Sequence, residues 1–185
     1  MAAARLGNGE VMKVVARRTE GRQRLALLLS CGLLVATFGA TATATAVPAA
    51  SETVLFVCEH GSAKSLLAAE LFNREAARRH LRLRAIARGT TPEGAPQSAT
   101  LAGLATDGID VAAYHPQQLL ATDVASARAV VSFDVDLTPF NPTQRPVSHW
   151  DRMPPVSEDY QRAKNAILQK LDDLLRQLRS GKAAR

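Results

Sequence analysis

The stretch from Thr53 to Ser65, TVLFVCEHGSAKS, determines the fold that the sequence predicts. Its first five residues are apolar or β-branched, which is typical of a short strand buried on both faces. Glu59–Ser65 is small and polar and predicts a loop, whereas Leu66–Arg79 is rich in Ala, Leu, Glu and Arg and favours a helix. A buried strand, a short loop and a helix in this order predict one unit of an α/β fold.

Strands and helices are predicted to alternate along the rest of the chain. The expected segments are strands at Leu83–Ala87, Ala127–Phe133 and Pro146–Trp150 and a helix at Gln97–Asp107. The stretch Thr138–Pro146 holds three prolines, so we expect it to be irregular. This alternation predicts a parallel sheet with helices on both faces.

Residues 157–178 show the clearest helical pattern. Ser157 is the expected N-cap, and Glu158 and Asp159 favour the positive end of the helix. An apolar face follows at helical spacing: Tyr160, Ala163, Ile167, Leu171, Leu174 and Leu178. We therefore expect this helix to cover one face of the sheet.

The composition is that of an ordinary globular protein with one domain. Of the 185 residues, 46% are hydrophobic and 22% are charged, which excludes wholesale disorder and a polytopic membrane protein. The net charge of +6 is uneven: residues 1–50 hold six basic and two acidic residues, or +4, whereas residues 51–185 hold 17 and 15, or +2. Because the expected domain carries little excess charge, we predict no nucleic-acid partner.

Residues 1–50 have the layout of a signal peptide. Four arginines lie between positions 17 and 24, the 16-residue apolar run Leu25–Ala40 follows, and small residues then continue to Ala50. We therefore expect an exported protein, periplasmic or secreted, with its folded domain at residues 51–185. The alternative is an uncleaved membrane anchor at residues 25–40, although a spanning helix needs about 20 apolar residues. Membrane contact is expected only through such an anchor.

The chain has two cysteines, Cys31 and Cys58. Because Cys31 lies inside the apolar run, Cys58 is the single cysteine of the expected mature domain and has no internal disulfide partner. A free thiol in an exported protein is unusual and draws attention to the loop that follows Cys58.

The loop after Cys58 is predicted to bind an oxyanion. In parallel sheets, ligands bind at the carboxyl ends of the strands. Small residues in this loop let the backbone curl so that successive N–H groups point inward, and the start of a helix adds positive potential. The expected oxyanion-binding residues are Glu59, His60, Gly61, Ser62 and Ala63.

Cys58 is the candidate nucleophile. The start of the helix and Lys64 favour its thiolate form, and a thiolate beside a bound oxyanion is placed to attack phosphorus or arsenic. Ser65 can donate a hydrogen bond to the sulfur. The competing interpretation is that Cys58 is a small buried apolar residue. Cys58 and His60 alone are a weak signal for a metal site, so we expect neither a metal nor a cofactor.

The segment TVLFVCEHGSAKSLLAAELFN resembles the first strand, catalytic loop and helix of the low-molecular-weight protein-tyrosine phosphatase and thiol-dependent arsenate reductase superfamily. That pattern is Val-Cys, five residues, then Arg and Ser or Thr, and it places Cys58 on the nucleophile and Ser65 on the residue that steadies the thiolate. The resemblance extends from about Thr53 to Leu178. It implies a four-stranded parallel sheet with flanking helices, and a phosphate ester, a phosphotyrosine protein or arsenate as substrate.

Two departures from the family pattern concern catalysis. Lys64 stands at the arginine position, where it supplies a point charge in place of a two-pronged clamp; the sequence resembles a branch with Glu-His-Gly after the cysteine and lysine at this position. The Asp-Pro pair that carries the general acid is also missing. Asp151, three residues before Pro154, is our candidate for the acid, with a turn-capping aspartate as the alternative reading. Asp134 and Asp136 are weaker candidates.

A third departure bears on the choice of reaction. Thioredoxin-coupled arsenate reductases use three cysteines, so this chain would need an external thiol to reduce arsenate. Three hypotheses follow: a phosphatase that forms a phosphocysteine on Cys58, an arsenate reductase that uses an external thiol, and an oxyanion-binding module without turnover.

Overall fold

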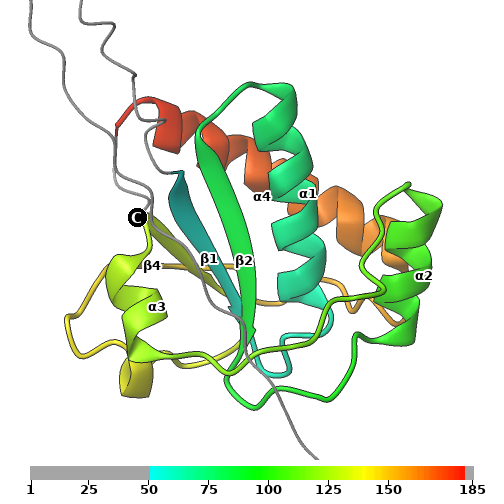
Figure 1. The fold of residues 1–185 in the computed structure, drawn as a ribbon, viewed down its shortest axis with the longest axis horizontal. Coiled ribbons are helices and arrows are strands. Elements are labelled where there is room, and N and C mark those ends of the chain that lie inside the picture. Colours follow the sequence, from blue (N-terminus) through cyan, green and yellow to red (C-terminus); the bar gives the residue numbers. More distant parts are fainter. Residues whose placement is uncertain (1–50, 182–185) are drawn as a thin grey trace, which may run out of the picture. The chain divides into compact units, whose positions relative to one another are not determined.

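Four parallel strands form the central sheet of the computed structural model, which describes residues 51–181 (Figure 1). They are β1 (Glu52–Cys58), β2 (Leu83–Gly89), β3 (Ala129–Ser132) and β4 (Val147–His149), paired in the order β2-β1-β3-β4. β1 has a neighbour on each side, which explains why its apolar residues are buried. All four strands lie where the sequence predicts them, and the expected parallel sheet is confirmed.

Helices cover both faces of the sheet. They are α1 (Lys64–Arg78), α2 (Ser98–Thr106), α3 (Ala121–Ser126), the 3₁₀ turn η1 (Thr138–Phe140) and α4 (Tyr160–Arg179). The sheet has an apolar core on each face. Alternate side chains of β1 enter one core or the other, because successive side chains of a strand point to opposite faces. Val54 and Phe56 pack with residues of α1 and α4, whereas Leu55 and Val57 pack with Val124 of α3. The expected α/β fold class is confirmed.

Phe56 lies at the centre of an aromatic cluster. Its ring centroid is 5.9 Å from that of Phe72, 6.3 Å from Phe133 and 5.7 Å from Trp150. Phe133 and Trp150 directly follow β3 and β4, so this cluster fixes the carboxyl ends of the strands relative to one another. Aromatic pairs at such distances add specific geometry to ordinary apolar burial.

The start of the last helix differs from the prediction. Ser157 is not its N-cap, because α4 begins at Tyr160 and the Asp159 side chain accepts a hydrogen bond from the backbone N–H of Arg162. The N–H groups of Glu158 and Asp159 both donate to the Pro155 carbonyl, so a separate turn precedes the helix. Of the predicted apolar face, Tyr160 is only partly buried, whereas the other five residues are buried as expected.

The predicted signal peptide, residues 1–50, and its alternative as an anchor at residues 25–40 lie outside the described residues. Within the described part of the chain, no helix combines the length and apolar character needed to cross a membrane.

Phe56→Ala is expected to lower the free energy of unfolding by about 3–5 kcal/mol, because it leaves a cavity inside the aromatic cluster. The same change at Phe140, which is only partly buried against the core on the α3 side, is expected to cost less. Urea unfolding of both variants measures the two losses. Equal losses would show that the aromatic cluster contributes no more to the free energy of unfolding than the partly buried Phe140 does.

Candidate active site

The loop after Cys58 lies at the carboxyl end of the sheet, between β1 and α1 (Figure 1). A cavity of about 180 Å³, here called the Cys58 pocket, opens beside it. Its lining comes from the loop, from the segment after β2 and from the end of β3: Cys58, Glu59, His60, Ser62, Ala63, Lys64, Glu93, Gln97, Phe133, Asp134 and Val135. The site therefore combines three segments that are distant in sequence.

Cys58 is largely buried at the end of β1, with 8% of its surface exposed. Its Sγ atom lies 2.9 Å from the Oγ atom of Ser65, which is fully buried in the first turn of α1. A hydroxyl at this distance can donate a hydrogen bond to a thiolate. The structure thus brings together the two residues that the sequence placed at the nucleophile and at its stabilising partner.

The carbonyl groups of residues 58–62 are all hydrogen-bonded to neighbouring segments. Each of the five carbonyl oxygens from residue 58 to residue 62 accepts a hydrogen bond from a group outside the loop. The donors, in order, are Thr90 N, Thr91 N, Glu93 N, Tyr114 Oη and Gln97 N, at 2.8 to 3.2 Å.

The backbone N–H groups of the loop have no such partners within residues 51–181. In a trans peptide unit the C=O and the following N–H point in opposite directions. Among the residues that the structure describes, none accepts a hydrogen bond from the backbone N–H groups of residues 59–65. A series of unpaired N–H groups at the start of a helix is an anion-binding nest. This arrangement supports the predicted oxyanion site, formed by the backbone rather than by the side chains of residues 59–63.

Two glycines allow the loop to approach the end of β2. Gly61 has a φ of +68°, a conformation that glycine adopts at little cost. A Cβ atom on Gly89 would lie 2.7 Å from the His60 carbonyl carbon and 2.9 Å from the Gly61 nitrogen, both of which are backbone atoms. The contact therefore has no room for a side chain at position 89.

Tyr114 holds the centre of the loop. Its hydroxyl donates a 2.8 Å hydrogen bond to the Gly61 carbonyl from 53 positions away in the sequence. Burial, together with the charge of Cys58, raises the pKa of Tyr114 to about 12. The phenol therefore stays protonated at neutral pH and remains a donor. No local sequence pattern links Tyr114 to the loop, so the sequence does not predict this hydrogen bond.

Lys64, the cation of the site, is already paired. Its Nζ atom lies 2.6 Å from Oδ2 of Asp134, in a bond that joins the start of α1 to the end of β3. The other carboxylate oxygen, Oδ1, accepts a 2.7 Å hydrogen bond from the backbone N–H of Arg152. Burial alone would raise the pKa of Asp134, but the bonds from Lys64 and Arg152 outweigh it and lower that pKa.

Two glutamates, Glu59 and Glu93, also line the Cys58 pocket. The Ser62 hydroxyl donates a 2.7 Å hydrogen bond to Glu93 Oε2. The His60 ring lies 3.8 Å from Glu93 Oε1 and 3.9 Å from Glu59 Oε1. Glu93 was not anticipated, since it stands in a Pro- and Gly-containing loop whose sequence predicts only a turn.

Asp151 lies next to Asp134 but outside the pocket lining. Its Oδ1 atom accepts a 3.1 Å hydrogen bond from the backbone N–H of Asp134. Of these two aspartates, the one that lines the Cys58 pocket is Asp134. Asp136, the third aspartate considered, is exposed and bonds to Thr138.

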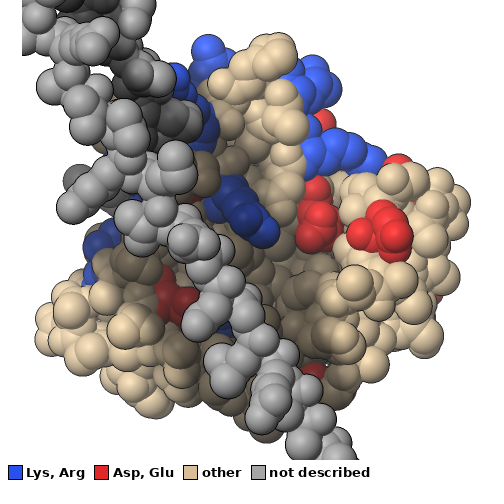
Figure 2. All heavy atoms as spheres, viewed as in Figure 1, with Lys and Arg blue, Asp and Glu red and all other residues tan. Residues whose placement is uncertain are grey.

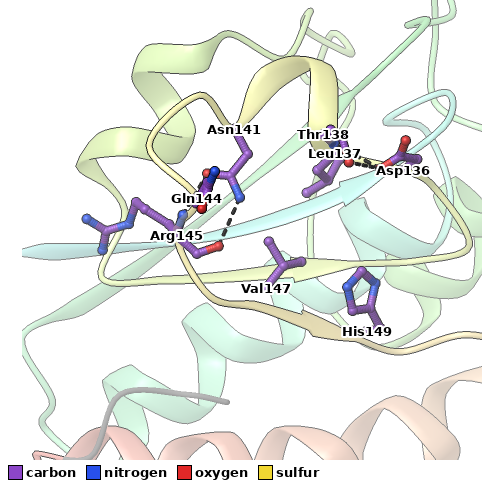
Figure 3. Close-up of a pocket in the computed structure, with 8 residues that line it drawn as sticks. All are labelled: Asp136, Leu137, Thr138, Asn141, Gln144, Arg145, Val147 and His149. Carbon is purple, nitrogen blue, oxygen red and sulfur yellow. Dashed lines mark hydrogen bonds between the residues drawn. The ribbon is translucent and has the colours of Figure 1, made fainter.

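A second cavity, of about 310 Å³, lies between η1 and the edge strand β4. Figure 3 shows Asn141 joined to Arg145 across this cavity and His149 on its β4 side. Its lining includes neither Cys58 nor Lys64, so it has no nucleophile of the kind found in the Cys58 pocket. Within residues 51–181, no cluster of three or more His, Cys, Asp or Glu residues could hold a metal ion.

The basic side chains near the end of α1 lie far from the loop. Figure 2 shows them gathered over the upper part of the molecule, around the C-terminal end of α1 and the start of β2. These are Arg78, Arg79, Arg82 and Arg84. Because the loop is at the carboxyl end of the parallel strands, this patch is at the opposite end of the sheet.

A parallel four-stranded sheet with a cysteine, an anion nest and a helix start at one strand end defines a phosphatase-like or arsenate-reductase-like protein. The chain belongs to the low molecular weight phosphotyrosine protein phosphatase family, whose sequence profile matches residues 53–180. The predicted family is therefore confirmed. No curated protein sequence matches the chain.

Solved structures with this fold include phosphatases and arsenate reductases. YfkJ from Bacillus subtilis is 18% identical, with a TM-score of 0.62 over 71% of this chain and 96% of that chain. The low molecular weight phosphotyrosine phosphatase from Vibrio cholerae is 19% identical, with a TM-score of 0.58 over 69% and 97%. The arsenate reductase from Archaeoglobus fulgidus is 26% identical, with a TM-score of 0.55 over 65% and 97%.

Gly89→Ala is expected to weaken the binding of inorganic phosphate at least about tenfold, because the new Cβ would push against the backbone of residues 60 and 61. Gly94→Ala is the matched control, since nothing lies within 4 Å of a Cβ at that position. Isothermal titration with phosphate compares the two variants. Unchanged affinity in Gly89→Ala would contradict the tight contact between the loop and β2.

Tyr114→Phe is expected to weaken phosphate binding about fivefold, since one hydrogen bond of about 1 kcal/mol no longer holds the Gly61 carbonyl away from the pocket. The control is Tyr160→Phe, which also removes a buried hydroxyl bond, at 2.6 Å to Asp107, but far from the loop in sequence and contacts. The same titration measures both variants. A similar loss in the two variants would point to a general effect on stability.

Proposed function

We propose that this protein is a cysteine-dependent phosphate-monoester hydrolase of the protein-tyrosine-phosphatase type that forms a phosphocysteine intermediate. The observation that carries the proposal is the position of Cys58 Sγ, 2.9 Å from Ser65 Oγ and beside a loop whose backbone N–H groups have no hydrogen-bond partner among the described residues. A nucleophile held beside a preorganised oxyanion site is the arrangement that phosphoryl transfer requires. Family membership supports the same chemistry.

In the first step, the Cys58 thiolate attacks phosphorus. An S–P bond forms while the P–O bond to the leaving group breaks, and the leaving oxygen takes up a proton from a carboxylic acid of the pocket. The N–H groups of residues 59–65 hold the three non-bridging oxygens, and the positive end of α1 favours their negative charge.

In the second step, water attacks the phosphorus of phosphocysteine. The S–P bond breaks, phosphate leaves, and the proton of the water passes to the carboxylate that served the first step. The sulfur departs as a thiolate, which the Ser65 hydroxyl stabilises with a hydrogen bond. Both steps therefore use the same buried pair of side chains.

Lys64 supplies the positive charge that the family normally takes from arginine. An ammonium has three donors, so it can hold Asp134 and an oxyanion oxygen together. It lacks the planar pair of donors with which arginine grips two oxygens, so it is expected to be the weaker clamp. The backbone nest accordingly carries more of the oxyanion binding here.

A phosphotyrosine side chain in a protein is the proposed substrate class. The family name indicates phosphotyrosine, and the Cys58 pocket opens to solvent past the exposed side chains of Glu59 and Glu93. The proposed ligand of the nest itself is the phosphate group, for which arsenate is a close stand-in.

Arsenate reduction is the second candidate, because arsenate reductases are among the structures that share the fold. Here the same thiolate would attack arsenic and displace hydroxide. An added thiol would then attack the Cys58 sulfur, so that an S–S bond forms, the S–As bond breaks and arsenite leaves with the two electrons. A second thiol would reduce this mixed disulfide and release the Cys58 thiolate. The chain holds no cysteine beyond Cys31 and Cys58, so the reductant in this proposal is an external thiol such as glutathione.

The full chain is expected to hydrolyse p-nitrophenyl phosphate under reducing conditions, and Cys58→Ser is expected to abolish turnover. Cys31→Ser, the same change at the other cysteine, is expected to retain it. Rapid acid quenching followed by mass spectrometry should find phosphate attached to Cys58 in the active chains.

Absence of both turnover and phosphocysteine would overturn the proposal. Arsenite formation from arsenate and glutathione, lost in Cys58→Ser, would then support the second candidate. Phosphate binding without either reaction would support an oxyanion-binding module.

A further inference from the structure

The leaving group of a phosphate ester needs a proton, and the sequence lacks the Asp-Pro pair that carries the acid elsewhere in the family. Three carboxylates line the Cys58 pocket, those of Glu59, Glu93 and Asp134. A general acid must come within hydrogen-bond reach of the leaving oxygen, so these three residues are the candidates that the pocket offers.

The surroundings of the three carboxylates differ. Glu93 contacts the side chains of the loop: Ser62 donates a hydrogen bond to it, and His60 lies beside it. Glu59 is exposed and has His60 as its neighbour. Asp134 belongs to a different segment, directly after Phe133, whose N–H donates to the Val57 carbonyl. Asp134 therefore reaches the pocket from the end of β3 and not from the loop.

The backbone around Asp134 is held in an unusual conformation. Asp134 has a φ of +54° and Arg152 a φ of +57°, values that side-chain-bearing residues seldom adopt. A reciprocal pair of hydrogen bonds locks the two turns together: Asp134 N–H donates to Asp151, and Arg152 N–H donates to Asp134. Such conformations cost about 1–3 kcal/mol each and cluster at sites where a side chain must be aimed.

We propose that Asp134 is the general acid of the hydrolase, with Lys64 linking its protonation to the arrival of the oxyanion. This inference rests on the proposed function. Asp134 gives its carboxyl proton to the leaving oxygen as the P–O bond breaks. The resulting carboxylate then accepts a proton from the water that attacks phosphocysteine, so Asp134 is protonated again, as it was in the substrate complex. It returns this proton to solvent when phosphate leaves.

The bond between Lys64 and Asp134 explains how the proton is acquired. In the free site Lys64 keeps the Asp134 carboxylate ionised. A bound phosphate brings negative charge close to that carboxylate and attracts N–H donors of Lys64, and both effects favour the protonated acid. The proton then comes from solvent when substrate binds.

Leaving-group dependence tests the proposal, because an acid matters most when the leaving phenol is a poor one. The kcat/KM of the full chain is measured for p-nitrophenyl phosphate and for phenyl phosphate, whose phenol is the weaker acid. In Asp134→Asn, the value for phenyl phosphate is expected to fall about 100-fold or more, and that for p-nitrophenyl phosphate about tenfold or less. Asp151→Asn keeps an oxygen for the Asp134 N–H and is expected to change both substrates by one factor.

Glu93→Gln is the matched change at another carboxylate of the pocket lining and is also expected to affect both substrates equally. Equal losses for the two substrates in Asp134→Asn would overturn the inference while leaving the proposed hydrolase intact. So would a selective loss for phenyl phosphate in Glu93→Gln or Asp151→Asn. A wild-type chain that releases neither phenol overturns the proposed function and this inference with it.

Discussion

The rest of the site depends on five hydrogen bonds. They hold the carbonyl groups of residues 58–62 to neighbouring segments of the chain. With these oxygens bonded outside the loop, the N–H group that follows each of them points the opposite way, because each peptide unit is planar and trans. The donors belong to residues 90–97 and to Tyr114, so the loop does not create the nest alone. Gly89 lets this second segment lie close enough to bind it.

In the proposed function, the loop binds an anion in a pocket that is also lined by carboxylates. Glu59, Glu93 and Asp134 line the same pocket as Lys64, and Lys64 is shared with Asp134. The basic patch on α1 and β2 lies at the other end of the sheet, where solvent and salt screen its field over such a distance (Figure 2). In the proposed function, affinity for an oxyanion therefore rests on short-range contacts with oriented backbone dipoles.

The local sequence pattern predicts the sheet and the Cys58–Ser65 pair, because a buried strand, a polar loop and a helix start all fall within 13 residues. Tyr114, Glu93 and Gly89 could not be found in this way, since their partners lie in the loop, 28 or more positions away. The prediction of Ser157 as N-cap was wrong for a related reason. The N–H groups of the next two residues, which would have formed the first turn of the helix, donate to the Pro155 carbonyl. Propensity describes single segments, whereas a site is made where segments meet.

The two departures from the family pattern at the site have one physical explanation in the mechanism proposed above. An arginine would grip two phosphate oxygens with its planar fork and would have fewer donors free for a neighbouring carboxylate. A lysine, with three donors on one atom, can bridge the Asp134 carboxylate and an oxyanion and can move between them. Lys64 is thus the weaker clamp, but it links the Asp134 carboxylate to the bound oxyanion. With Asp134 as the general acid, this chain has no need of an acid supplied by an Asp-Pro pair after β4.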